Sequence, residues 1–299
     1  MRIDSISPSL QPIHDVFIKN SGVNLVVLRI DLMHPTIGGN KLFKLKYNLE
    51  EAKKQNLKTL LTFGGAFSNH IAATAAAGKE VGLKTIGIIR GEEHQELNPT
   101  LRFAVDNGMQ LKFISREHYR NKNSNEFIDS LNQQFKNFYL IPEGGSNDLG
   151  VKGCKEIIQT VGIDFDHVCC ACGTGATMAG ITLSLKKGQE AIGFQVLKAE
   201  GYIQQEVTKW LQQFDRSASS PGWDIKEGYH FGGYAKISPE LINFIDRFEK
   251  NNGIPLDNIY TGKMMFGIYD LVQKGVIKKG KTVVAIHTGG LQGNVGFGK

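Results

Sequence analysis

The stretch TLLTFGGAFSNH, at residues 59–70, joins a short apolar run to a glycine-rich turn. Such a run predicts a buried strand at 59–63. The alanine-rich residues 71–81 then predict a helix that stops at Gly82, and 84–89 reads as a further strand. A strand, a turn, a helix and a strand in this order are typical of parallel α/β structure.

The same rhythm extends in both directions along the chain. Upstream, Leu42, Leu45, Leu49 and Ala52 form an apolar stripe at helical spacing. Further helices are expected at 99–107, 125–135, 151–161, 176–185 and 263–274. Further strands are expected at 110–114, 138–141, 167–171, 191–196 and 282–287. Strands that alternate with helices of this length indicate parallel sheets covered on both faces, so the fold class is α/β.

Composition excludes several classes of function. The chain has 299 residues, a net charge of +6, a pI near 9.0 and a mean hydropathy of −0.21. Its basic residues are interspersed with acidic ones, as at 50–54, which is typical of a solvated surface rather than of a nucleic-acid site. No apolar run is long enough for a bilayer and the first residues do not resemble a secretion signal, so we expect a cytoplasmic protein.

Four cysteines raise the question of a metal site. Cys169, Cys170 and Cys172 crowd into an expected strand, where neighbouring side chains point to opposite faces. No second pair of cysteines or histidines stands at zinc-ligand spacing. We therefore expect no metal and no disulfide, and treat Cys154 and the other three as small buried apolar residues.

Four glycine-rich turns follow expected strands, at 64–70, 143–147, 173–177 and 287–290. Ligands of parallel α/β sheets lie beyond the carboxyl ends of the strands. One such turn is weak evidence because glycine often serves only to reverse the chain, but four at one edge predict a ligand cleft.

The turn Gly173-Thr174-Gly175-Ala176-Thr177 follows a strand and opens a helix. Its backbone N–H groups, its threonine hydroxyls and the helix terminus would suit a phosphate, although a plain turn remains the alternative. It lacks the Gly-Lys-Ser/Thr ending of an ATP-binding loop and the spacing of a dinucleotide fingerprint.

Lys41 follows the turn Gly38-Gly39 at the beginning of an expected helix, and Lys44 lies one turn later on the same face. The positive end of the helix and the second ammonium would both lower the pKa of Lys41 and favour an amine nucleophile. A pair of ordinary surface lysines is the alternative.

Taken together, and in this order, the motifs resemble those of the family of 1-aminocyclopropane-1-carboxylate deaminase and D-cysteine desulfhydrase. They are Gly38-Gly39-Asn40-Lys41 with Lys44, Gly64-Gly65 with Ser68-Asn69-His70, Pro142–Asn147 (PEGGSN), Gly173–Thr177, and Tyr260-Thr261-Gly262-Lys263. The resemblance covers about residues 25–295. It implies a tryptophan-synthase-β-like fold of two α/β lobes, 41–141 and 1–40 with 142–299, with pyridoxal 5′-phosphate between them. It also implies a homodimer.

The resemblance assigns roles to the cofactor-binding residues. Lys41 would hold the cofactor as a Schiff base and transfer protons. Lys44 and the 173–177 loop would bind the phosphate. Asn69 would bond the ring hydroxyl, and Thr261 would face the ring nitrogen.

On the substrate side, Ser68 would lie near the carboxylate as donor, proton shuttle or nucleophile, while an N-cap is its alternative role. Asn69 and His70 would also contact substrate. Tyr234 and Tyr260 match aromatic positions on this side, with ordinary packing as the alternative, and Tyr260 joins Lys41 and Ser68 as a catalytic residue.

Two positions favour a desulfhydrase-like reaction. Cyclopropane deaminases have glutamate at the position of Thr261 and glutamine at that of His70. A neutral partner leaves the ring nitrogen unprotonated, which suffices for β-elimination from a small amino acid such as D-cysteine, with pyruvate, ammonia and sulfide as products. Leu291 and Gln292 depart from the family pattern and put the substrate in doubt.

Three alternatives stay open at this point. The first is deamination of 1-aminocyclopropane-1-carboxylate to 2-oxobutanoate and ammonia. The second is β-replacement or dehydration of serine-like substrates. The third is a catalytically silent relative that binds pyridoxal phosphate or another phosphate compound.

Overall fold

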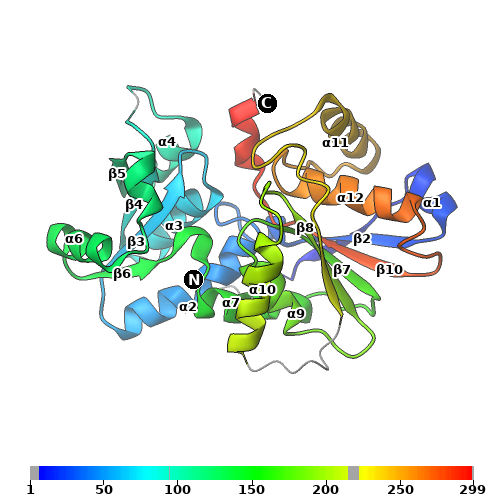
Figure 1. Ribbon diagram of the computed structural model, residues 1–299, viewed down its shortest axis with the longest axis horizontal. Helices are drawn as coiled ribbons and strands as arrows, with labels where there is room; N and C mark the ends of the chain where they lie inside the picture. The colour runs from blue at the N-terminus through cyan, green and yellow to red at the C-terminus, as the bar shows by residue number, and fades with distance from the viewer. Residues whose placement is uncertain (1–6, 94, 215–221, 298–299) are drawn as a thin grey trace.

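Two β-sheets organise the chain, and a computed structural model describes residues 7–93, 95–214 and 222–297. The larger sheet has the strand order β1-β2-β10-β7-β8-β9, and Figure 1 shows it beside the smaller sheet. Its strands are β1 (Ser9–Pro12), β2 (Asn24–Arg29), β7 (His167–Cys172), β8 (Glu190–Gln195), β9 (Trp223–Lys226) and β10 (Thr282–Ile286). All neighbours are parallel except β1, which runs antiparallel to β2 at the edge.

The smaller sheet is wholly parallel and has the order β5-β4-β3-β6. Its strands are β3 (Thr59–Gly65), β4 (Lys84–Arg90), β5 (Met109–Ile114) and β6 (Phe138–Ile141). One face packs on α3 (Asn69–Val81) and α4 (Pro99–Asp106). The other packs on α5 (Arg116–Arg120) and α6 (Asn125–Phe135).

Helices cover both faces of the larger sheet. One face packs on α7 (Asp148–Cys154), α8 (Glu156–Gln159), α9 (Ala176–Thr182) and α10 (Tyr202–Gln213). The other packs on α1 (Val16–Ser21), α11 (Pro239–Asn252) and α12 (Thr261–Gln273). Three 3-10 segments complete the description: η1 (Ile30–Leu32), η2 (Glu143–Gly145) and η3 (Leu291–Phe297).

Strand β7 shows why the sequence forms a sheet buried on both sides. Cys170 and Cys172 pack into the core beneath α9, whereas Cys169 and Ala171 pack into the core beneath α12. This confirms that Cys169, Cys170 and Cys172 are small buried residues on alternate faces of a strand, whereas Cys154 is buried at the end of α7; all four are free thiols.

Helix α2 (Asn40–Lys54) determines where the two predicted site lysines lie. It packs against α7 and α3, and buries Leu42, Phe43 and Leu45 completely. Its first residue follows Gly39, whose φ is +63° and whose backbone meets the 288–290 turn. The amide of Asn40 donates to the carbonyl of Thr288 at 3.4 Å, so the first turn of α2 abuts the end of β10.

The expected helices and strands are confirmed, with two corrections. Residues 151–161 form two short helices, α7 and α8, because Asn147 caps α7 earlier and Gly150 and Gly153 weaken helix propensity. The sheets are not entirely parallel, since β1 is antiparallel. Elements that sequence reasoning did not anticipate are β1, β2, β9, α1, α5, α10 and α11.

Two sequence-based expectations remain predictions. The boundaries of the lobes at residues 41 and 141 are not tested, although every strand of the smaller sheet lies between Thr59 and Ile141. The expectation that the N-terminus carries no secretion signal also stays a prediction, and its first residues, 1–6, lie outside the described part of the chain. Within the described ranges, no helix combines the length and apolarity needed to cross a bilayer.

Gly39→Ala tests the junction between α2 and the end of β10. An added Cβ would lie 1.9 Å from the Thr288 carbonyl oxygen, and the positive φ strains any L side chain. We expect the free energy of unfolding to fall by about 2–4 kcal/mol, measured by urea denaturation. Gly38→Ala is the matched control, because nothing lies within 4 Å of its added Cβ. Equal stability of the two variants would contradict this account.

Candidate active site

A cavity of about 690 Å³ lies where the carboxyl ends of strands from both sheets meet. Loops after β3, β4, β6, β7 and β10 contribute to its lining. The four glycine-rich turns therefore converge on one cleft.

The cleft brings together most of the predicted site residues. Those that line it are Lys41, Lys44, Ser68, Asn69, His70, Gly173, Thr174, Gly175, Thr177, Tyr234 and Tyr260. Ala176 and Thr261 are completely buried and do not line it. Leu291 and Gln292 do not line it either, whereas Gly293 and Gly296 of the same segment do.

Lys44 lies at the floor, 2% exposed, and its ammonium has only neutral partners. Its Nζ donates to the Gly144 carbonyl at 3.0 Å, to Ser146 Oγ at 3.2 Å and to Thr174 Oγ1 at 3.4 Å. Ser146 and Thr174 are themselves 2.7 Å apart. Among the residues that the structure describes, Lys44 has no carboxylate partner, so a buried positive charge faces the 173–177 loop uncompensated.

Lys41 borders the same cleft, one helical turn away. Its Nζ donates to Asn40 Oδ1 at 3.3 Å, and Asn40 Nδ2 donates to Thr177 Oγ1 at 2.8 Å. Burial and the nearby Lys44 ammonium lower the pKa of Lys41 from 10.5 to about 7. A large fraction of Lys41 is therefore an unprotonated amine at neutral pH, which is the form that attacks a carbonyl carbon.

The loop after β3 presents Ser68, Asn69 and His70 to the cleft. Ser68 Oγ accepts from the Ile71 amide at 3.4 Å, which confirms its N-cap position and leaves its hydroxyl proton free to donate. Asn69 Oδ1 is buried without a hydrogen-bond partner among the described residues. An orphaned buried acceptor of this kind points to a missing donor in the cleft.

His70 is 2% exposed and neutral. Burial, together with the Lys41 and Lys44 ammonium groups, lowers its pKa well below the usual 6.5. Thr62 Oγ1 donates to the Ile141 carbonyl and therefore accepts from His70 Nε2, 2.8 Å away. The proton thus lies on Nε2, and the lone pair of Nδ1 is left without a partner in the described structure.

Tyr234 and Tyr260 form a pair on the opposite wall. Their hydroxyls are 3.2 Å apart and their rings pack edge to face with centroids at 6.0 Å. Burial raises the pKa of Tyr260, so its phenol is neutral and can act as a hydrogen-bond donor.

Thr261 makes its hydrogen bonds within the loop before α12 and does not line the cleft. Its Oγ1 donates to Asp257 Oδ2 at 2.5 Å and accepts from the Asp257 amide at 2.9 Å. Asp257 also accepts the amides of Ile259, Tyr260 and Thr261. The predicted contact of Thr261 with the ring nitrogen thus receives no support from this geometry, whereas Thr288 does line the cleft.

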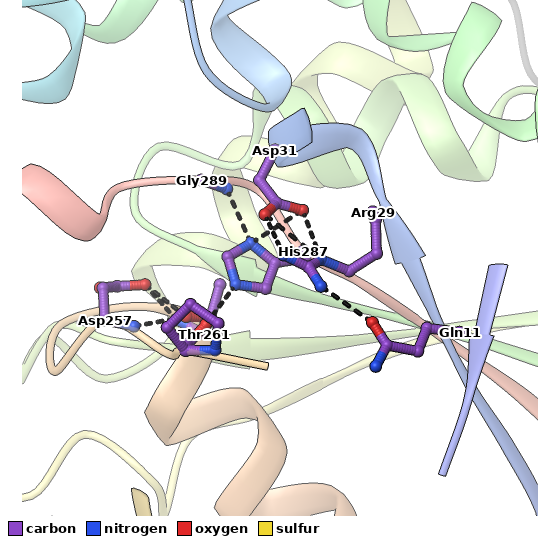
Figure 2. Close-up of polar contacts among 8 residues, drawn as sticks. Gln11, Arg29, Asp31, Asp257, Thr261, His287 and Gly289 are labelled. Atoms are coloured by element: carbon purple, nitrogen blue, oxygen red, sulfur yellow. Dashed lines mark hydrogen bonds and ion pairs between the residues drawn. The ribbon is translucent and has the colours of Figure 1, made fainter. Parts of the chain in front are cut away.

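A buried polar network connects the loops behind the cleft, as Figure 2 shows. His287 Nε2 donates to the Pro255 carbonyl at 2.8 Å, and His287 Nδ1 accepts the Gly289 amide at 3.3 Å. Asp31 lies 3.4 Å from His287 Nδ1 and forms a 2.7 Å ion pair with Arg29. His287 therefore holds the 255–261 loop and the 287–290 turn together.

Sequence reasoning missed several residues of the lining, among them Arg90, Cys172 and Thr288. Arg90 ends β4, and the rule that ligands bind at carboxyl ends of strands would have found it. Cys172 ends β7 in the same way, and Thr288 lies within a turn that the sequence already singled out.

Pyridoxal 5′-phosphate agrees with the residues present. The floor offers the ammonium of Lys44 and the hydroxyls of Ser146 and Thr174 beside a glycine-rich loop. No described carboxylate neutralises the Lys44 ammonium. Lys41 supplies an unprotonated amine in the same cavity, and Asn69 supplies an unpaired polar atom. Together they could hold a phosphate, an aldehyde and a ring hydroxyl.

Comparison with known proteins defines the class first. The family model described as pyridoxal-phosphate dependent enzyme matches residues 10–289. The chain therefore belongs to this family, and pyridoxal phosphate is its cofactor.

Two relatives and one solved structure show which members of this family the chain is similar to. A Pyrococcus horikoshii protein provisionally named 1-aminocyclopropane-1-carboxylate deaminase is 31% identical over 291 residues, covering 93% of this chain and 87% of its own. The mitochondrial bifunctional D-cysteine desulfhydrase/1-aminocyclopropane-1-carboxylate deaminase of Arabidopsis thaliana is 30% identical, covering 91% and 74%. The crystal structure of an ACC deaminase homologue superposes with a TM-score of 0.85 at 27% identity, covering 100% and 94%.

The lowered pKa of Lys41 is testable in cofactor-free protein. We expect acetylation of Lys41, followed by peptide mass spectrometry, to reach half its maximal rate near pH 7. Lys44→Met should raise that midpoint because it removes a repelling charge. Since the folded-state pKa lies below the ordinary value, stability should also rise between about pH 7 and 10.5 in wild type, and less in Lys41→Met. A midpoint near 10 in wild type would contradict this assignment.

Proposed function

We propose that this protein catalyses α,β-elimination on a small amino acid, with D-cysteine as its preferred substrate. The balanced reaction converts D-cysteine and water into pyruvate, ammonia and hydrogen sulfide. Membership of the pyridoxal-phosphate family and the desulfhydrase activity named for a relative both support the proposal.

The lack of a free carboxylate in the described lining of the cleft favours elimination over opening of the cyclopropane ring. Among the described lining residues, Glu143 is the one carboxylate, and it pairs with Lys122 at 3.3 Å. Asp257 is 1% exposed, does not line the cleft and is occupied by four hydrogen bonds from its own loop. No described carboxylate is thus free to keep a ring nitrogen protonated, which disfavours opening of an unactivated cyclopropane ring. Elimination needs a weaker electron sink, because the leaving group at Cβ takes the electrons.

In the proposal, the residues of the floor hold the cofactor. Lys44, Ser146 and Thr174 would bind the phosphate, Asn69 the ring hydroxyl, and Lys41 the carbonyl carbon. Bound in this way, pyridoxal phosphate supplies an electron-withdrawing system conjugated to the amino group of the substrate, which acidifies the Cα–H bond.

The same chain provides the groups that handle protons. The unprotonated amine of Lys41 would accept the Cα proton of the substrate, as its lowered pKa permits. Ser68 keeps a hydroxyl proton to donate to the substrate carboxylate. The neutral phenol of Tyr260 donates to Tyr234 at 3.2 Å, which leaves the hydroxyl proton of Tyr234 free to be donated toward the departing sulfur.

The second candidate is deamination of 1-aminocyclopropane-1-carboxylate, because two relatives carry that activity in their names. Homodimeric assembly and a cytoplasmic location belong to the same proposal. The first rests on the family resemblance and the second on the composition of the sequence.

Product analysis separates the two candidates. With D-cysteine we expect pyruvate and sulfide in equal amounts, and with 1-aminocyclopropane-1-carboxylate we expect little 2-oxobutanoate. Lys41→Ala should lower the elimination rate at least about a hundredfold because it removes the proton acceptor. Lys54→Ala, an exposed lysine on the same helix, is the control. A larger kcat/KM for the cyclopropane substrate would overturn the assignment.

A further inference from the structure

Lys263 is a completely buried lysine that the proposed reaction does not use. It lies in the first turn of α12, and its side chain is 0% exposed. Its Nζ donates to two backbone carbonyls, those of His230 and Gly233, each at 2.9 Å. Within the described residues it has no ion-pair partner, and burial lowers its pKa to about 8, against a partial offset from Asp257. A buried ammonium is costly to maintain, so its contacts call for an explanation.

Both of its acceptors lie in a loop whose backbone is strained. Phe231 and Ala235 have φ values of +52° and +56°, which residues other than glycine rarely adopt. Gly232 and Gly233 also have positive φ, at +94° and +134°. A segment with four such residues in five needs support from outside, and Lys263 provides it at two points.

This loop carries Tyr234 into the cleft. Tyr234 directly follows Gly233, one of the two residues that Lys263 supports, and precedes Ala235. Its hydroxyl accepts from Tyr260 at 3.2 Å. Phe231 anchors the loop on its other side by packing against Phe266 of α12, with ring centroids 5.0 Å apart. Tyr260 immediately precedes α12, the helix that carries Lys263. Lys263 therefore joins the loop that carries Tyr234 to the helix that Tyr260 precedes.

We propose that Lys263 is a positioning residue that holds the 230–235 loop in its strained conformation and thereby fixes Tyr234 on the substrate side of the cleft. Among the described residues, the hydrogen bonds of Lys263 go to the 230–235 loop and none goes to the floor formed by Lys41, Lys44 and the 173–177 loop. The consequence for substrate binding rests on the proposed function, whereas the effect on the loop does not.

The first test is hydrogen exchange in cofactor-free protein. In Lys263→Met, which keeps an unbranched side chain of similar length but has no side-chain N–H group, we expect the amides of Gly233 and Lys236 to exchange about tenfold faster. Both amides donate within the loop in wild type, at 3.0 and 3.1 Å. Lys236→Met, an exposed lysine of the neighbouring backbone, is the matched control and should leave exchange unchanged. Unaltered exchange in a folded Lys263→Met protein would overturn the proposal.

The second test uses D-cysteine and a double-mutant cycle. Lys263→Met should raise KM at least about threefold and leave the affinity for pyridoxal 5′-phosphate within about twofold of wild type. In a Tyr234→Ala background, Lys263→Met should have no further effect on KM, because the lysine acts through that tyrosine. An equal rise of KM on Lys263→Met in wild type and in Tyr234→Ala would contradict the claim that Lys263 acts through Tyr234. If D-cysteine is not a substrate at all, the proposed function fails but the exchange result still decides the role of Lys263.

Lys263→Gln is a second, milder variant that tests the proposal if Lys263→Met does not fold. Glutamine keeps an N–H donor without the charge, so its loop amides should exchange at rates between those of wild type and Lys263→Met. Failure of both variants to fold would overturn the proposal, because it would assign Lys263 to the stability of the whole core rather than to one loop.

Discussion

Two lysine side chains meet in the floor of the cleft with no described carboxylate to neutralise them. Lys44 is 2% exposed and bound only to a carbonyl and two hydroxyls, and Lys41 lies close enough for the two charges to repel. Such an arrangement is unfavourable in an empty protein interior. It becomes favourable when an anion binds beside Lys44 and when Lys41 can lose its proton. The phosphate and the carbonyl carbon of pyridoxal phosphate meet both requirements.

Much of the fold serves to bring these two lysines to that place. Helix α2 begins at Asn40 because Gly39 adopts a positive φ against the Thr288 carbonyl. Its buried side packs on α7, which covers the larger sheet, and on α3, which covers the smaller one, so the floor lies between the two lobes. The opposite wall meets the beginning of α2 at the 287–290 turn. There His287 ties the 255–261 loop to the 287–290 turn, and Lys263 supports the loop that carries Tyr234.

The sequence predicted those parts of the structure that depend on local patterns. The run at 59–63, the alanine-rich helix after it and the glycine-rich turns each carry their own signal, and the cleft follows because parallel strands end at one edge. Strand β2 and helix α11 were missed although both have apolar residues at suitable spacing. The role of Thr261 depends on a hydrogen bond to Asp257, four residues away, which no sequence pattern predicts. Lys263 was visible only as part of a motif, because its acceptors are about 30 residues distant.

Reduction of the holoenzyme with borohydride, followed by peptide mass spectrometry, tests the central claim most directly. The reagent fixes the cofactor permanently to the amine that holds it. We expect a phosphopyridoxyl group on Lys41 alone, and none on Lys44 or Lys263. A label on either of these lysines, or no label on protein saturated with pyridoxal 5′-phosphate, would contradict the account.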